Sequence, residues 1–301
     1  MILTDLTLAE ADRSGLRLTA DAAIVLDGDR ITWAGPRAEL AQDGETRSLG
    51  GRLVTPGLID LHSHVYPYGS AIGIPADELV AQQGTTTCVS AGDAGANNFA
   101  AFRRHIVAQT RTRLYAFIHI ANIGLSAFPV AELYNIDFAQ TEAAAKAIAE
   151  NSDMVLGAKV RMSENVIAKH GLEPLKRAIM ACEQAGAGMK VMVHIGGVET
   201  RQLMSQILDL LRPGDILTHC YSGAPNMAGQ FTNIVQDGKL LPAALAAKQR
   251  GVVFDIGHGG GSFDFTVAEA AIAIECALHD LHEVGNGTLI LGKVANFSIS
   301  E

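Results

Sequence analysis

Five side chains that can bind a metal ion stand at or near the ends of short apolar runs in the sequence. His62 and His64 close LVTPGLIDLHSH, Lys159 lies in MVLGAKVRMS, His194 lies in KVMVHIGG and His219 lies in DILTHCYSG. Alternate residues of a strand point the same way, so the two imidazoles of the HxH pair can bind one ion. Imidazole is a common ligand of zinc-like metals. Four histidines at the ends of three apolar runs therefore predict a metal centre.

Each of these residues also has a purely structural interpretation. An HxH pair can occur by chance in a chain with ten histidines, and a single buried histidine is often a hydrogen-bonded core residue. A lysine that closes an apolar strand is costly unless its stem packs and its ammonium finds a partner. A salt bridge of Lys159 to Glu164 or Asp153 would provide that partner, and composition alone favours it.

Two further segments offer candidate site residues. His258 lies in FDIGHGGGSF, where Gly259 and Gly260 let the backbone approach a ligand closely. These three residues are candidates for substrate binding, and a tight turn with an incidental histidine is the alternative. Asp93, in SAGDAG, is either a loop cap or a site residue.

The elements that must carry these residues alternate between strands and helices. From residue 53 onward, about seven apolar runs alternate with periodic segments that predict helices over 141–149, 173–185, 200–211 and 241–249. The candidate residues fall at the carboxyl ends of the runs, which share one face in a closed parallel barrel. An open doubly wound sheet would also bind ligands there, but the Gly-rich phosphate loop that such a sheet usually carries is not found after the first run. The pattern favours a barrel over residues 53–285.

The N-terminal residues 1–52 show a different pattern. Short strands at Ile2–Leu8, Ala22–Leu26 and Arg30–Ala34, broken by turn residues, predict a small β-domain. Residues 286–301 again contain strand-like runs. We expect these closing strands to return to the β-domain and make it discontinuous.

Composition excludes several classes of protein. The chain has 301 residues, of which 48% are hydrophobic, so a packed fold rather than a disordered chain is expected. The net charge is −9 without a basic cluster, so a nucleic-acid partner is not expected. No long apolar stretch predicts a membrane span or a signal peptide. Four scattered cysteines favour reduced thiols and a cytoplasmic location.

The motifs resemble those of a known family. LVTPGLIDLHSHVY resembles the opening signature of the amidohydrolase superfamily, in which an HxH segment supplies two metal ligands. GAKVRMS, VMVHIG, LTHCYSG and FDIGHGGGSFDFTVAEAAIA resemble the dihydroorotase-like amidohydrolase/deacetylase branch in order and context. The resemblance covers the chain to about residue 275 and again over the final strands. It implies a (β/α)8-type TIM barrel with a small discontinuous β-sandwich domain formed by both termini.

The resemblance also implies a chemistry. It implies two divalent metal ions, Zn²⁺ being the first expectation, bridged by a carboxylated Lys159. His62 and His64 would bind the more buried ion, and His194 and His219 would bind the other. A hydroxide between the ions would attack the amide or ester carbonyl of a small acylated or cyclic amide substrate.

The last part of the chain departs from the family pattern. The family's eighth strand ends in an Asp that binds the buried ion and transfers a proton, and Asp280 in ALHDLHEVG aligns with it. Residues 268–284 can equally form one helix, which would remove Asp280 from the site. The segment before GTLILG reads as shortened by one helix, so we expect a barrel that is incomplete in its last β/α unit.

Two alternatives to a metallohydrolase follow. One is a degenerate, non-catalytic homologue that keeps the fold and metal binding. The other, a metal-free carbohydrate or phosphate enzyme, lacks a supporting pair of carboxylates or a phosphate loop. A small-molecule substrate is expected in the leading interpretation, and a homo-oligomer is left open.

Overall fold

The computed structural model describes residues 1–12, 15–81, 84–198, 200–223, 233–257, 263–272 and 297–299. The chain divides into two compact units. One unit contains Met1–Asp60, Glu78–Thr87 and the C-terminal strand β14 (Phe297–Ile299), and the other contains Leu61–Asp77 and the described residues between 88 and 272. The domain boundaries at 52 and 285 that the sequence suggested stay a prediction.

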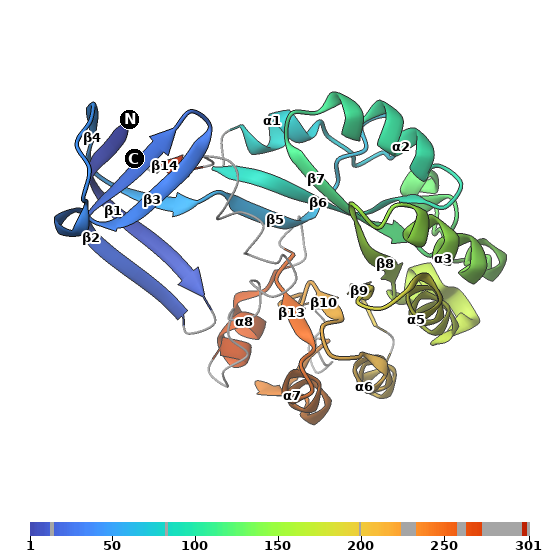
Figure 1. Ribbon diagram of the computed structural model, residues 1–301. Coiled ribbons are helices and arrows are strands. Elements are labelled where there is room, and N and C mark those ends of the chain that lie inside the picture. The colour runs from blue at the N-terminus through green and yellow to red at the C-terminus, as the bar shows by residue number, and fades with distance from the viewer. Residues whose placement is uncertain are drawn as a thin grey trace. The chain divides into compact units, whose positions relative to one another are not determined.

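Seven parallel strands form one curled sheet, and their order in the sheet is their order along the chain (Figure 1). The strands are β5 (Leu58–Ser63), β6 (Thr85–Gly95), β7 (Arg113–His119), β8 (Val155–Arg161), β9 (Lys190–His194), β10 (Ile216–Thr218) and β13 (Val253–Asp255). A doubly wound sheet would reverse its strand order part-way, so this topology is that of a (β/α) barrel. The strands of the described residues leave the sheet open between β13 and β5, so over this part of the chain the barrel is incomplete, as predicted.

Helices cover the outer, convex side of this sheet (Figure 1). The α-helices of the described residues are α1 (Ala76–Val80), α2 (Phe99–His105), α3 (Thr141–Glu150), α4 (Glu164–Ile167), α5 (Glu173–Ala185), α6 (Arg201–Leu210), α7 (Pro242–Gln249) and α8 (Phe265–Ile272). The four helices predicted from periodicity agree with α3, α5, α6 and α7 to within one residue at each end. A short hairpin of β11 (Val235–Gln236) and β12 (Lys239–Leu240) precedes α7.

Helix α5 shows why the periodic segments fold onto the sheet. Its buried residues Leu175, Ala178, Ala181 and Cys182 recur at a spacing that places them along one face of a helix. That face packs against β8 and β9, the strands that carry Lys159 and His194. The apolar face of the helix thus fixes the position of two strands whose ends belong to the site.

The N-terminal unit contains a five-stranded sheet in the order β14-β4-β1-β2-β3. Its other strands are β1 (Ile2–Asp12), β2 (Gly15–Asp27), β3 (Arg30–Pro36) and β4 (Thr46–Pro56). The C-terminal strand β14 pairs antiparallel with β4, so strands from both ends of the chain do share one sheet. The described strands form a single sheet here, and the predicted sandwich stays a prediction.

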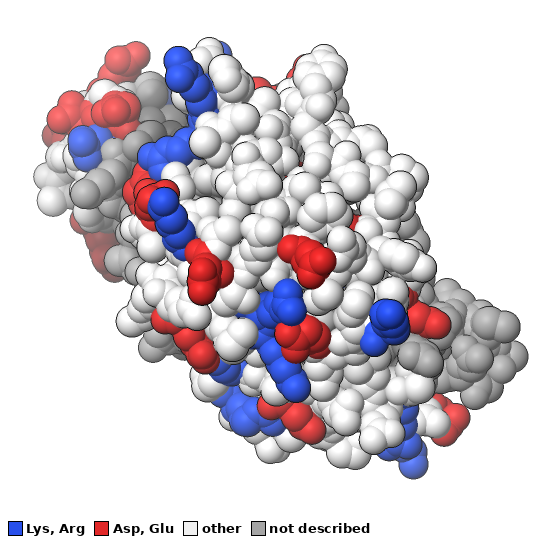
Figure 2. All heavy atoms as spheres, turned by 90° about the vertical axis from the view of Figure 1, so that its right-hand side faces the viewer, with Lys and Arg blue, Asp and Glu red and all other residues white. Residues whose placement is uncertain are grey.

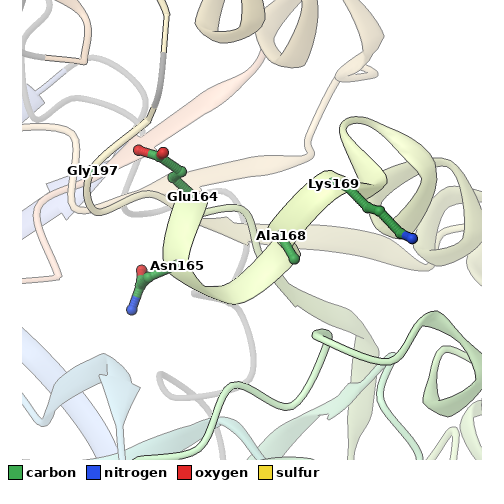
Figure 3. Close-up of a pocket in the computed structure, with 5 residues that line it drawn as sticks. All are labelled: Glu164, Asn165, Ala168, Lys169 and Gly197. Atoms are coloured by element: carbon green, nitrogen blue, oxygen red, sulfur yellow. The ribbon is translucent and has the colours of Figure 1, made fainter.

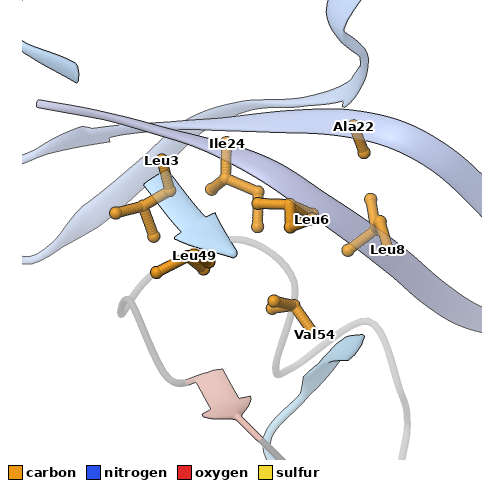
Figure 4. Packing of buried hydrophobic residues seen from close by; sticks show 7 residues of the cluster. All are labelled: Leu3, Leu6, Leu8, Ala22, Ile24, Leu49 and Val54. Carbon is orange, nitrogen blue, oxygen red and sulfur yellow. The ribbon is translucent and has the colours of Figure 1, made fainter. Parts of the chain in front are cut away.

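Alternation along the strands gives this sheet two apolar faces. In β2, Ala22 and Ile24 belong to one buried cluster, whereas Ala23 and Val25 belong to another on the opposite face. Figure 4 shows the first cluster, whose members point toward one another from β1, β2 and β4. These residues are Leu3, Leu6, Leu8, Ala22, Ile24, Leu49 and Val54.

Charged side chains of both signs are interspersed on the face in Figure 2, which carries helices α2, α3 and α5. Ion pairs on these helices include Lys146–Glu150 and Arg177–Glu173, each one helical turn apart. In the described part of the chain, no helix combines the length and the apolar character needed to cross a membrane.

Candidate metal centre

The five predicted ligands lie at or just after the carboxyl ends of four strands of the barrel sheet. His62 is in β5 and His64 follows it, Lys159 is in β8, His194 ends β9 and His219 follows β10. The ring centroids of His62 and His64 are 5.4 Å apart, those of His62 and His219 are 4.6 Å apart, and those of His194 and His219 are 4.5 Å apart. The fold therefore brings all four imidazoles into one cluster.

The hydrogen bonds of His62 determine which of its nitrogens is available to a ligand. Nδ1 lies 2.6 Å from Oγ1 of Thr218, and that hydroxyl donates to Oδ2 of Asp255 at 2.6 Å. Because the hydroxyl proton is used toward Asp255, the proton between the ring and Thr218 comes from Nδ1. The lone pair of His62 is therefore on Nε2, which faces Nζ of Lys159 at 3.4 Å.

His64 is oriented by a carboxylate. Its Nδ1 lies 2.8 Å from Oδ1 of the fully buried Asp93. The other Asp93 oxygen accepts from the backbone N–H of Val65 at 2.9 Å and from the hydroxyl of Ser90 at 2.7 Å. A carboxylate held in this way fixes the ring tautomer and leaves Nε2 as the ligating nitrogen, an arrangement common in zinc sites. Asp93 is therefore a site residue within β6 and not a loop cap.

His219 is oriented by a backbone carbonyl. Its Nδ1 donates to the carbonyl oxygen of Gly257 at 2.6 Å. Only a glycine fits at 257, because a Cβ there would lie 2.3 Å from Oγ1 of Thr218 and 3.0 Å from Nδ1 of His219. The close approach of the chain after β13 thus leaves Nε2 of His219 as the nitrogen with the lone pair.

Lys159 is buried inside the barrel and does not form the salt bridge that composition favoured. Its side chain is 1% exposed, and its Nζ contacts Nε2 of His62 and Sδ of Met192, at 3.4 and 3.5 Å. Asp153 pairs instead with Arg103 at 2.8 Å. The alternation of β8 turns Lys159 into the barrel, where neither predicted acidic partner lies.

Burial lowers the pKa of His62, His194, His219 and Lys159. Burial, followed by the charge of Lys159, holds the pKa of His62 well below its usual range, and burial with the neighbouring His219 does the same for His194. Burial and Lys159 lower the pKa of His219 to about 3. Burial also lowers the pKa of Lys159 to about 7, although the charge of Asp255 opposes this shift. Neutral imidazoles are the form that binds metal ions.

The donor set fits a divalent ion. Among the described residues, no three His, Cys, Asp or Glu side chains are already arranged to coordinate one metal ion. Three of the imidazoles nevertheless use Nδ1 for a hydrogen bond to Thr218, Asp93 or Gly257. The lone pair of each of these rings is therefore on Nε2. The amine of Lys159, a hydrogen-bond donor, lies opposite Nε2 of His62. These residues would hold the metal ions implied by the sequence motifs.

Four predicted site residues fall in segments that the structure does not describe. Asp280, His258, Gly259 and Gly260 lie outside the described residues. The alternative helix over 268–284 is described only as far as Ile272, where α8 ends.

A second cluster of buried polar side chains lies near Lys159, and no sequence motif predicted it. The backbone N–H of Ala121 donates to Nδ1 of His119, so the proton of the neutral ring is on Nε2. Nε2 lies 3.1 Å from Oε1 of Glu132, off the N–H axis. Glu132 accepts from Nη1 of Arg161 at 3.0 Å. Burial raises the pKa of Glu132, but His119 and Arg161 outweigh it and hold that pKa below its usual value.

A shallow hollow lies beside the end of β8. It has a volume of about 600 Å³ and is lined by Glu164, Asn165, Ala168, Lys169 and Gly197. In Figure 3, Glu164 points toward the Gly197 turn and Lys169 points away from it. The backbone N–H of Glu164 donates to the carbonyl of Gly197 at 2.8 Å, which ties the segments after β8 and β9 together.

Comparison with known proteins places this geometry in a family. A deacetylase from Agrobacterium fabrum is 36% identical over 252 residues, which are 83% of this chain and 60% of that protein. A dihydroorotase structure is 33% identical with a TM-score of 0.75 and matches 91% of this chain and 69% of its own. The chain belongs to the amidohydrolase superfamily. An adenine deaminase structure agrees, with 32% identity, a TM-score of 0.74, and coverage of 90% of this chain and 70% of its own.

The amidohydrolase assignment rests on these relatives, because no protein-family model matches the chain. The chain spans between 58% and 61% of the length of the curated deacetylases that it matches. Amidohydrolase membership implies the use of divalent metal ions, for which the imidazole cluster is the candidate site.

Proposed function

We propose that this protein is a metal-dependent amidohydrolase that cleaves the amide or ester bond of a small acylated or cyclic amide substrate. The observation that carries the proposal is the imidazole cluster, in which three histidines are oriented through Nδ1 so that Nε2 can bind a metal ion. The names of the relatives, deacetylase, dihydroorotase and adenine deaminase, support hydrolysis at carbon–nitrogen or acyl bonds.

Within this proposal, His62, His64, Lys159, His194 and His219 hold two divalent ions, Zn²⁺ being the first expectation. Metal ions bound there supply a water nucleophile at neutral pH and polarise the scissile carbonyl. The chain's own contribution is a set of imidazoles oriented through Nδ1 and a buried lysine. A buried, uncharged amine is the form that reacts with carbon dioxide, which suits the carboxylated Lys159 that the family resemblance implies.

The first test is metal analysis and hydrolysis by the purified full chain. We expect one to two zinc-like ions per chain and hydrolysis of at least one N-acyl amino acid, cyclic amide or acyl ester. His62→Asn and His64→Asn should each lower metal content and activity. His105→Asn is the matched control, because His105 is an exposed histidine on α2. Fewer than one ion per chain would contradict the proposal, and a metal-loaded chain that hydrolyses nothing would favour the non-catalytic alternative.

A substitution of His258 tests whether this residue contacts the substrate or binds a metal ion. We place His258 against the substrate with Gly259 and Gly260, so His258→Asn should leave metal content unchanged and raise KM. A loss of metal equal to that of His64→Asn would show that His258 is a ligand.

Lys159→Ala tests the bridge. It should strongly reduce metal occupancy, because two cations would then lack the negative group between them. Short carboxylic acids such as acetate should restore part of the occupancy by replacing the lost carbamate. If they restore nothing, and mass spectrometry of the native wild type finds no carbon dioxide adduct, the bridging role of Lys159 is wrong.

The cytoplasmic location and a homo-oligomeric state remain proposals. Cys88, Cys182 and Cys220 are buried, and no disulfide is found among the described residues, which suits a reducing compartment. Fractionation of cells and light scattering of the purified chain would test these two points.

A further inference from the structure

Arg161 stands above the imidazole cluster on the strand that carries Lys159. The two residues are two apart in β8, so their side chains leave the same side of the strand. In the sheet register Arg161 is paired with His194. Arg161 therefore lies one layer closer than Lys159 to the carboxyl ends of the strands, which is where barrel enzymes bind their substrates.

Two contacts hold the guanidinium group of Arg161. Nη1 donates to both oxygens of Glu132, at 3.0 and 3.3 Å, and the group lies over the ring of Phe128 with 5.7 Å to the ring centroid. The Glu132 side chain is 1% exposed and that of Arg161 is 16% exposed. Nε2 of His119 lies 3.1 Å from Oε1 of Glu132. Glu132 is thus a buried carboxylate that holds Arg161 through Nη1.

The opposite edge of the guanidinium has no hydrogen-bond partner in the part of the chain that the structure describes. Within the described residues, Nε and Nη2 of Arg161 make no hydrogen bond. Their N–H bonds are parallel and form the planar fork that matches the two oxygens of a carboxylate. A largely buried arginine with this edge unpaired, on the same strand as Lys159 and paired in register with His194, can bind a ligand there.

We infer that the Nε and Nη2 edge of Arg161 binds a carboxylate of the substrate, so that the preferred substrates are acylated acids. This inference rests on the proposed function, because it assigns the substrate class of the same site. Glu132 is a positioning residue: it holds Nη1, and thereby aims the free edge toward the ends of β8 and β9. Nothing in the inference requires a proton to move, since arginine stays charged at any working pH.

The test compares matched acidic and neutral compounds. N-acetyl derivatives of the common amino acids are assayed beside their primary amides, with wild type, Arg161→Met and Arg161→Lys, all loaded with zinc. Arg161→Met should lower kcat/KM for the acids about 10- to 100-fold, the range expected when a charge-assisted hydrogen bond is lost. It should change kcat/KM for the amides less than about threefold. Arg161→Lys, which keeps the charge but loses the fork, should fall between, and it guards against misfolding of the methionine variant.

Glu132→Gln tests the positioning role. It should raise KM for the acids while kcat changes little, and its KM for the amides should stay near that of wild type. The control for Arg161→Met is Arg104→Met, because Arg104 is an exposed arginine on α2. A merely structural role of Glu132 would lower kcat for acids and amides alike.

A binding measurement separates this inference from the proposed function. The same N-acetyl acids should raise the melting temperature of the wild-type protein, and should do so much less for Arg161→Met, whether or not they are hydrolysed. If nothing is hydrolysed and this difference is seen, the proposed function fails and the carboxylate site stands. If Arg161→Met responds to acids as wild type does, in binding and in turnover, the inference is wrong. It is also wrong if no acid binds.

Discussion

His62, on the first strand of the barrel sheet, donates its Nδ1 proton to the hydroxyl of Thr218, on the sixth strand, across 2.6 Å. The two residues are 156 positions apart in the chain, and the contact crosses the inside of the curled sheet. The hydroxyl of Thr218 in turn donates a hydrogen bond to Oδ2 of Asp255 on the seventh strand. The side chains thus connect the first strand to the last described ones, and the same contact sets the tautomer of a proposed ligand.

Thr218→Val removes this hydroxyl and preserves the shape of the side chain. We expect metal affinity or kcat/KM to fall about 10- to 100-fold, the usual effect of losing a group that orients a ligating histidine. Zinc titration with a competing chelator measures the affinity. Thr218→Ser keeps the hydroxyl and serves as the control. Equal affinity in the valine and serine variants would show that the hydroxyl does not orient His62.

Gly92→Ala tests whether the absence of a side chain at position 92 makes room for Lys159. Gly92 has a φ of +86°, and a Cβ there would lie 2.5 Å from Cβ and Cγ of Lys159. Gly188 has a similar φ of +91°, with nothing within 4 Å of its added Cβ. Gly188→Ala should therefore show only the backbone strain, about 1–3 kcal/mol, and Gly92→Ala should lose more stability and also metal. Urea unfolding and metal analysis compare them, and equal losses would mean that contact with Lys159 does not matter.

Asp77→Asn tests a loop contact away from the site. The carboxylate of Asp77 accepts from the backbone N–H groups of Arg111 and Thr112 and from the hydroxyls of Thr110 and Thr112. These hydrogen bonds, that of Arg111 first, hold the pKa of Asp77 below its ordinary value of 3.8. Because the folded pKa is the lower one, this stabilisation is complete well above pH 3.8 and is lost as the pH falls below it.

At pH 7 we expect Asp77→Asn to lower the free energy of unfolding by about 1–3 kcal/mol, the cost of losing hydrogen bonds to a charged group. The difference from wild type should shrink when urea unfolding is repeated below pH 4. Asp137→Asn is the control, because Asp137 is exposed. A difference for Asp77→Asn that is the same at both pH values would rule out the charge as its source.

Asp280→Asn tests the proposed proton transfer. If Asp280 ends the eighth strand, the substitution should abolish turnover while most of the metal remains, since a positioned acid/base contributes about 10²- to 10⁴-fold. Turnover is compared with that of wild type at equal metal content. If residues 268–284 form one helix, the substitution should be nearly silent. A silent substitution in an active protein would remove Asp280 from the mechanism.

The sequence was sufficient for the local decisions in this molecule. Periodicity located α3, α5, α6 and α7 to within one residue, because each helix needs an apolar stripe that can be read from neighbouring positions. The ends of the apolar runs likewise predicted strand ends at His62, His64, Lys159, His194 and His219, and these residues lie within or directly after β5, β8, β9 and β10. Asp255 ends the apolar run GVVFD by the same signal, and could have been found in this way.

The tertiary structure alone decided how those residues meet. The partners of the imidazoles, Thr218, Asp93 and Gly257, and the pair of Glu132 with Arg161 come from different strands or loops. Composition gave Lys159 an acidic partner from nearby in the chain, and the structure gives it His62 and Met192 instead. Local sequence fixes which way a side chain leaves its strand. The distance to a partner far along the chain depends on the curvature of the whole sheet, which no short segment encodes.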